Sequence, residues 1–220
     1  KNFYIKSNHL ENQKYINLYD YHKSIQWTHE KDVVKENYGV SERAWKVIEC
    51  EKEIYQYIKY GEALKDFAFK VRQPGYDYSA FALNYCLAFE LVSNRILKNF
   101  LIKKIPEYDV SAIKKGKIKT LKDSKYYTSY YLGNYTYFLG YFKEKYFNSL
   151  QQLDFDFDMF YKNFEDSANL RNKVAHVRDK LSGEEYNDLL LLLFGRNDNK
   201  SEQTPVFESI CKLSWMADKI

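Results

Sequence analysis

The chain has 220 residues, of which 45% are hydrophobic and 18% aromatic, a composition that argues against a disordered chain. Only eight glycines and three prolines occur, so long helices are favoured over a sandwich of many short strands. The formal net charge of +4 permits a polyanionic partner without requiring one. No run of 18 apolar residues occurs, so no transmembrane helix and no membrane partner are expected.

The first part of the chain predicts an N-terminal helical extension. Residues 1–40 are weakly patterned, and we expect helical pieces around 15–27. From Ser41, which can cap a helix, apolar residues recur at helical spacing, with a break expected near Gly61. A Pro-Gly pair ends this segment, so we place a domain boundary after residue 74.

The remaining residues, 75–220, predict a helical bundle. Its clearest helix covers 78–101, where apolar residues follow each other at steps of three and four, and Asp77 stands at the N-cap position. Pro106 stops this helix. The segment 106–125 is predicted to be a loop or lid, and it carries six lysines between Lys114 and Lys125.

Four further helices are predicted after this loop. Residues 126–147 contain few β-branched residues and are expected to be helical, with a β-hairpin around Gly133-Asn134 as the competing interpretation. Aspartates precede a helix over 157–177. The sequence Ser182-Gly-Glu-Glu185 is a capping box for a helix through Phe194, and a terminal helix is expected over 206–217. Together, the predicted helices indicate an all-α fold.

Three cysteines, Cys50, Cys86 and Cys211, lie far apart and form no C-x-x-C pair. An odd cysteine count without a signal peptide indicates reduced thiols and a cytoplasmic location, and we expect ordinary buried thiols. Because the first residue is Lys, we also expect the chain to be a piece of a longer protein.

The most informative segment runs from Asn169 to Arg178. Arg171 lies seven residues after Phe164, so it continues an apolar stripe, and its guanidinium needs a partner there. Asn172 and His176, four residues apart, lie on an adjacent face. Arg171 and His176 are separated by about 140° around an unbroken helix, so they converge only on a groove bordered by both faces or where the helix ends.

This arrangement, Arg171-Asn172-x-x-x-His176 late in a helix and followed by a capped apolar helix, resembles the R-x(4–6)-H motif of the HEPN superfamily. The resemblance covers roughly residues 76–200. In that family a polar residue commonly follows the Arg, and many members carry an acidic residue on a facing helix, for which Glu90 is the candidate. The resemblance implies a HEPN-like four-helix bundle that dimerises and places two copies of the motif across one cleft.

The resemblance also implies metal-independent cleavage of RNA, in which the ribose 2′-hydroxyl attacks the adjacent phosphate and leaves 2′,3′-cyclic phosphate ends. His176 suits proton transfer at neutral pH, and Arg171 offers a fork of donors to the phosphorane oxygens. Asn172 can orient the histidine or hold the phosphate. This chemistry needs no metal or cofactor, and no His, Cys and carboxylate set at ligand spacing appears in the sequence.

RNA binding is predicted for six cationic residues, Lys114, Lys115, Lys117, Lys119, Lys173 and Arg178. Tyrosines 126, 127, 130 and 131 follow the lysine-rich loop and can stack on bases, whereas the alternative is a solvated loop beside tyrosines of the core. Arg178 occupies the position where minimal HEPN toxins carry a Tyr, so regulation through that Tyr is not expected. The long extension indicates a larger effector of phage defence, a toxin system or a CRISPR-ancillary protein. Its expected partners are an RNA substrate, a second copy and an antitoxin or regulatory domain.

The sequence is also compatible with two other interpretations of Arg171, Glu90 and His176. Arg171 and Glu90 can form a structural ion pair, with His176 as a solvated residue at a helix end. The domain is then a non-catalytic HEPN-like module that binds RNA, a nucleotide or a protein partner, or a structural dimerisation domain. The other histidines, His9, His22 and His29, are expected at the surface.

Overall fold

The computed structural model describes residues 4–5, 16–17, 38–71, 76–111, 119–125, 129–175, 180–196 and 204–220. Within these ranges the fold is all-α, as predicted. Its α-helices are α3 (Glu42–Cys50), α4 (Lys52–Val71), α5 (Ser79–Val92), α6 (Lys98–Lys104), α7 (Leu132–Lys145), α8 (Phe147–Gln151), α9 (Phe157–Ala175), α10 (Gly183–Phe194) and α11 (Val206–Trp215). A π-helical turn, η1 (Ser93–Leu97), joins α5 to α6, and two 3₁₀ turns are η2 (Lys122–Ser124) and η3 (Ala217–Lys219).

Two short strands, β1 (Tyr4–Ile5) and β2 (Ile16–Asn17), pair antiparallel. The second strand lies inside 15–27, where helical pieces were expected, so that prediction is wrong at residues 16 and 17. A β-branched residue such as Ile16 is compatible with an extended backbone. The rest of 15–27 lies outside the described residues.

The helices α3 and α4 are the described helical part of the N-terminal extension. The Ser41 side chain caps α3 as predicted, accepting a hydrogen bond from the Ala44 N–H at 3.3 Å. The predicted break near Gly61 is wrong, because the break falls at Glu51 and α4 continues through Gly61. Gly61 instead lets α4 approach α5 closely, since a Cβ there would lie 2.5 Å from the ring of Tyr85.

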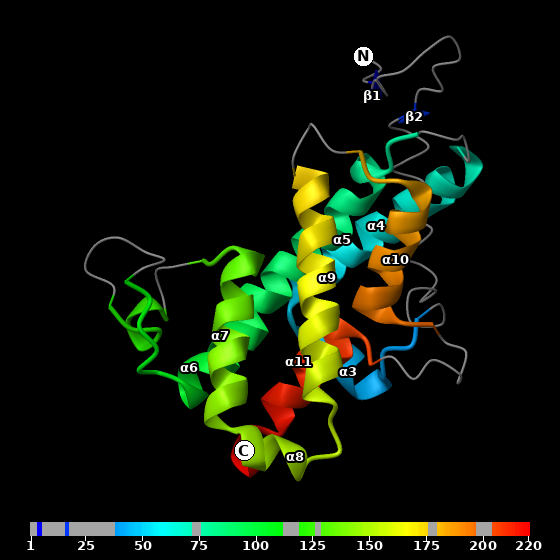
Figure 1. The fold of residues 1–220 in the computed structure, drawn as a ribbon. Helices are drawn as coiled ribbons and strands as arrows, with labels where there is room; N and C mark the ends of the chain where they lie inside the picture. The colour runs from blue at the N-terminus through cyan, green and yellow to red at the C-terminus, as the bar shows by residue number, and fades with distance from the viewer. Residues whose placement is uncertain are drawn as a thin grey trace.

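The central helix is α5, which packs against α4, α9, α10 and α11. Figure 1 shows α9 in front of α5, with α7 on one side of α9 and α10 on the other. The N-cap residue of α5 is Tyr78, so the assignment of Asp77 is wrong by one position. The Asp77 carboxylate nevertheless accepts hydrogen bonds from the N–H groups of Ser79 at 3.0 Å and Leu181 at 3.2 Å, which ties the start of α5 to the segment before α10.

The helix predicted over 78–101 contains a π turn that the apolar pattern does not reveal. The predicted stripe is buried through Val92 and again at Phe100, but Ile96 between them is only half-buried, and the neighbouring Leu97 is fully buried instead. A π turn holds an additional residue compared with an α turn, so it shifts the buried face by one position. This shift lies within η1 and turns Asn94 toward α7, where its amide forms hydrogen bonds.

The loop after α6 folds back on itself in its described part. Asp109 and Thr120 form an isolated antiparallel bridge, and Val110 and Leu121 are fully buried beside it. The following helix α7 begins at Leu132 and includes Gly133 and Asn134, so the competing hairpin interpretation is wrong.

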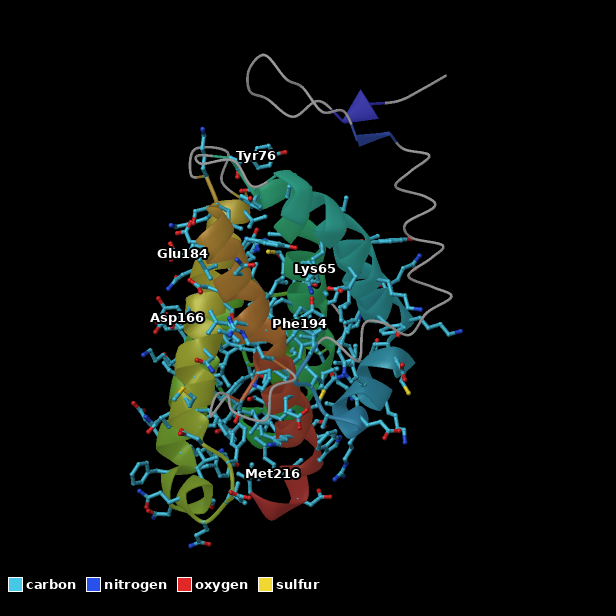
Figure 2. All side chains as sticks on the ribbon, turned by 90° about the vertical axis from the view of Figure 1, so that its right-hand side faces the viewer. Lys65, Tyr76, Asp166, Glu184, Phe194 and Met216 are labelled. Carbon is cyan, nitrogen blue, oxygen red and sulfur yellow. The ribbon has the colours of Figure 1, made fainter. Side chains whose placement is uncertain are left out.

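A single aromatic core joins these helices. Phe194 lies at its centre (Figure 2), with its ring centroid 4.6 Å from that of Tyr38 and 4.8 Å from that of Phe207. Residues on both sides of residue 74 contribute to this core, and the proposed domain boundary stays a prediction. Among the described residues, no helix has the length and apolar character needed to cross a membrane.

Candidate active site between α5 and α9

Arg171 and Glu90 form an ion pair that joins α9 to α5. The Nε and Nη2 atoms of Arg171 both donate to Glu90 Oε1. The two side chains are 21% and 31% exposed, so the pair lies in the helix interface and remains open to solvent at one edge. Glu90 therefore lies beside Arg171 on the helix that faces α9, which is the arrangement that the family resemblance implies for an acidic residue.

The aromatic face of α9 positions Arg171. Phe157, Phe160 and Phe164 are buried along this face, and Arg171 lies two turns beyond Phe164. The helix begins where the Asp156 carboxylate accepts a hydrogen bond from the Met159 N–H at 2.9 Å. The guanidinium thus ends an apolar stripe, and Glu90 satisfies the need for a partner that such a position creates.

The next two residues of the motif have different partners. Asn172 is exposed, and its Oδ1 accepts a hydrogen bond from Arg171 Nη1 at 3.4 Å. Lys173 forms an ion pair with Glu185 of α10, whose carboxylate also accepts the Ser182 N–H in the predicted capping box. The hydrogen bond from Lys173 lowers the pKa of Glu185. Lys173 would have to exchange this carboxylate for a phosphate to fill its predicted role in RNA binding.

The contacts of Arg171 leave it able to hold an anion. A guanidinium has five N–H donors, and three of them are directed at Glu90 and Asn172. The remaining donors, with the exposed Asn172 amide beside them, can bind phosphate oxygens. Glu90 fixes the orientation of the guanidinium while this edge stays available.

Cys86 lies one turn before Glu90 on α5 and is buried. Burial raises the pKa of its thiol to about 12, and Glu90 adds to this effect while Arg171 opposes it. Cys86 therefore stays protonated near neutral pH and does not act as a nucleophile for this site. Cys211 is also buried, as expected, but Cys50 is exposed at the end of α3, so the prediction of buried thiols is wrong for that residue.

Asn94, which the sequence motif does not include, connects the site to α7. Its Nδ2 atom donates to the backbone oxygens of Glu90 and Tyr130, each at 3.0 Å. Its Oδ1 atom accepts from the Tyr130 N–H at 2.8 Å and from the Tyr135 hydroxyl at 2.9 Å. The start of α7 is therefore attached to η1, one turn after Glu90. No strong signal in the sequence marks it, because Asn84, Ser93 and Arg95 are also polar residues of the predicted 78–101 helix.

The remaining predicted site residues are mostly outside the described ranges. The described part of α9 ends at Ala175, and the helix was predicted to continue to Val177. Lys119 is described and exposed. The predicted residues outside the described ranges are His176, Arg178, Lys114, Lys115 and Lys117, together with the other histidines, His9, His22 and His29.

A second polar cluster lies between α4, α5 and the segment before α3. Glu62 is only 8% exposed and accepts hydrogen bonds from the hydroxyls of Tyr38 and Tyr85, and its Oε1 lies 3.6 Å from the Lys65 ammonium. Figure 2 shows Lys65 beside the upper part of the core. Burial first, and then the charge of Glu62, raises the pKa of Tyr38 well above its ordinary value. The cluster is enclosed and internally paired, so we assign it to stability.

Among the described residues, no group of three His, Cys, Asp or Glu side chains is arranged to hold a metal ion. The comparisons with protein families, with curated proteins and with solved structures found no match to this chain.

Proposed function

We propose that the chain is a metal-independent endoribonuclease of the HEPN type, with Arg171, Asn172 and His176 as its motif and Glu90 as the facing acid. The observation that carries this proposal is the ion pair between Glu90 and Arg171. It brings together an acidic residue and the motif arginine near the end of α9, and His176 follows the last described residue of that helix.

The proposed reaction is an internal transesterification. The ribose 2′-oxygen attacks the adjacent phosphorus, the 2′-O–P bond forms, and the bond from phosphorus to the 5′-oxygen breaks. His176 transfers protons between the 2′-hydroxyl, solvent and the leaving oxygen. Arg171 donates to the phosphorane oxygens as negative charge builds there, and Glu90 holds the guanidinium in position. The products carry a 2′,3′-cyclic phosphate and a 5′-hydroxyl.

The proposed active form is a homodimer in which two copies of the motif face one cleft. Arg171 and His176 diverge by about 140° on a continuous helix, so a site shared between subunits brings more of the required groups to one phosphate. We propose a role in phage defence or in a toxin system in the cytoplasm, with an antitoxin or a regulatory domain as a further partner.

One observation favours a second candidate function. Both Nε and Nη2 of Arg171 are directed at Glu90, as in an ion pair that only fastens two helices. The chain would then be a non-catalytic helical module that uses the same surface to bind RNA, a nucleotide or a protein. Tight RNA binding without cleavage under any condition, including with candidate activators, is the result that favours this second function.

The test is a cleavage assay on single-stranded and transfer RNA in the presence of EDTA. The variants are His176→Ala, Arg171→Ala and Arg171→Lys, and the matched control is Arg196→Ala, which removes an exposed arginine at the end of α10. We expect the wild type and the control to cleave. We expect the three site variants to lose at least about 100-fold in rate, because lysine keeps the charge but not the planar fork of donors.

Two further measurements make the assay decisive. A substrate with a single 2′-deoxyribose at the cleaved position should resist cleavage, because it lacks the attacking hydroxyl. Circular dichroism and thermal unfolding of each variant report whether it is folded. Activity that disappears with EDTA, or that survives in folded His176→Ala and Arg171→Ala variants, contradicts the proposed mechanism.

A further inference from the structure

Two tyrosines on the α7 side of the molecule are unusually exposed. Tyr131, at the N-cap of α7, is 74% exposed, and Tyr137, within α7, is 65% exposed. These are the two highest values among the large hydrophobic side chains that the structure describes. By contrast, Tyr130 and Tyr135 are buried in the core. Of the tyrosines near the lysine-rich loop that are described, Tyr131 is therefore one whose side chain is largely exposed to solvent.

Tyr131 lies close to the candidate active site through a short chain of contacts. The backbone of Tyr130 forms hydrogen bonds with Asn94 through both its N–H and its carbonyl oxygen. Asn94 in turn donates to the backbone oxygen of Glu90, and Glu90 holds Arg171. Tyr131 is the next residue after Tyr130, so it directly follows the backbone that Asn94 holds one helical turn after Glu90.

The charge distribution distinguishes this face from the opposite one. The described residues of 98–111, 119–125 and 129–145, which include α6, the described part of the loop and α7, contain eight lysines and four acidic residues. Of these lysines, Lys98 is buried, and Lys143 and Lys145 form ion pairs with Asp158 and Glu107. On the other side of α9, a groove of about 460 Å³ between α9 and α10 is lined by acidic and leucine side chains, Asp166, Glu185, Asp188, Leu170, Leu191 and Leu192, with Asn169. Figure 2 shows Asp166 and Glu184 on that same side. A polyanion is therefore attracted to the α7 face and repelled from the α9–α10 groove.

We infer that the exposed surface of α7 and of its N-terminal end binds single-stranded RNA, with Tyr131 and Tyr137 stacking against unpaired bases. Exposed aromatic rings on a cationic surface are the combination that binds single strands with little sequence preference. A duplex keeps its bases stacked on one another, so it does not offer them to these rings. The inference rests on the proposed function in one respect, namely that the bound RNA is the substrate. The surface of α7 then binds the RNA, and the Arg171 motif cleaves it.

Binding to a probe that cannot be cleaved separates the inference from the cleavage mechanism. The probe is a short, fluorescently labelled oligouridine with 2′-O-methyl riboses, and the readout is fluorescence anisotropy at fixed salt. Tyr131→Ala and Tyr137→Ala should each raise the Kd by about 5- to 150-fold, the range found when one stacking ring is removed. Tyr131→Phe should bind within about 2-fold of the wild type, because the ring that stacks is retained.

The matched control is Phe147→Ala, which removes another exposed aromatic residue, 49% exposed, at the start of α8 beyond the opposite end of α7. It should leave the Kd unchanged. A duplex version of the probe should bind more weakly than the single strand. Because Tyr131 and Tyr137 are largely exposed, both alanine variants should keep the wild-type Tm.

Each of these binding measurements supports or contradicts the inference whether or not the protein cleaves RNA. Loss of binding in the alanine variants with retention in Tyr131→Phe supports it, even if no RNA is ever cleaved. Unchanged binding in both alanine variants, equal loss in Tyr131→Phe and Tyr131→Ala, preference for duplex RNA, or no binding of the wild type to the probe overturns it. If the alanine variants still bind and cleave RNA normally, the inference fails while the proposed function stands.

Discussion

Replacing Gly61 by Ala is the sharpest test of how α4 packs against α5. A Cβ at Gly61 would lie 2.5, 2.6 and 2.7 Å from three ring atoms of Tyr85, well inside van der Waals contact. The ring cannot move away easily, because Tyr85 is fully buried and its hydroxyl donates to Glu62 at 2.6 Å. Helix propensity alone predicts the opposite sign, since alanine in a helix interior is favoured over glycine.

The expected magnitude follows from three contributions. Overpacking a filled core costs about 1–3 kcal/mol. Displacing the Tyr85 ring weakens its hydrogen bond to the Glu62 carboxylate, which adds about 1.5–3 kcal/mol when the bond is lost. The gain in helix propensity returns about 1 kcal/mol. We therefore expect Gly61→Ala to lower the free energy of unfolding by about 1.5–5 kcal/mol.

Urea unfolding followed by circular dichroism measures this change, and Gly140→Ala in α7 is the matched control. Nothing lies within 4 Å of a Cβ at Gly140, so only the propensity contribution applies there. In thermal unfolding, the control should raise the Tm by about 2–4 °C, whereas Gly61→Ala should lower it by about 3–20 °C. If both variants are stabilised to the same extent, the close approach of α4 and α5 is wrong.

Three other predictions concern the same core and the site. Burial raises the pKa of Tyr85 well above its ordinary value, so the free energy of unfolding should fall as the pH rises above about 10, and Tyr85→Phe should flatten this fall in urea titrations. At pH of about 8 a thiol reagent should modify the exposed Cys50 rapidly, and fast modification of folded Cys86 would contradict its burial. A double-mutant cycle of Glu90→Gln and Arg171→Ala should give a coupling energy of about 1 kcal/mol. This is smaller than the coupling of a fully buried pair, because both side chains are partly exposed. A coupling energy of zero would refute the pairing.

The features that could be predicted from the sequence are those that depend on near neighbours. The Ser41 cap and the Ser182–Glu185 capping box are local hydrogen-bonding patterns within one turn, and both are confirmed. The aromatic spacing of α9 correctly predicted that its apolar stripe leads to Arg171. The break at Glu51 was not predicted, because no glycine or proline marks it.

Features that depend on distant neighbours were missed. Gly61 was interpreted as a helix break, and only the position of Tyr85 explains why a glycine is needed there. The π turn at Ser93–Leu97 has no strong local signal, so Asn94 was not recognised as the residue that fastens α7 beside the site. The facing position of Glu90 was predicted through the family resemblance, and the catalytic role of His176 stays a prediction.

The chemistry of the product ends tests the central claim most directly. RNA is incubated with the wild type in EDTA, and the fragments are analysed by mass spectrometry. The proposed mechanism predicts 2′,3′-cyclic phosphate and 5′-hydroxyl ends from the wild type and from Arg196→Ala, and no such ends from folded Arg171→Ala or His176→Ala. Fragments with 3′-hydroxyl and 5′-phosphate ends, or cyclic phosphate ends still produced by both site variants, would contradict the claim that Arg171 and His176 cleave RNA through the 2′-hydroxyl.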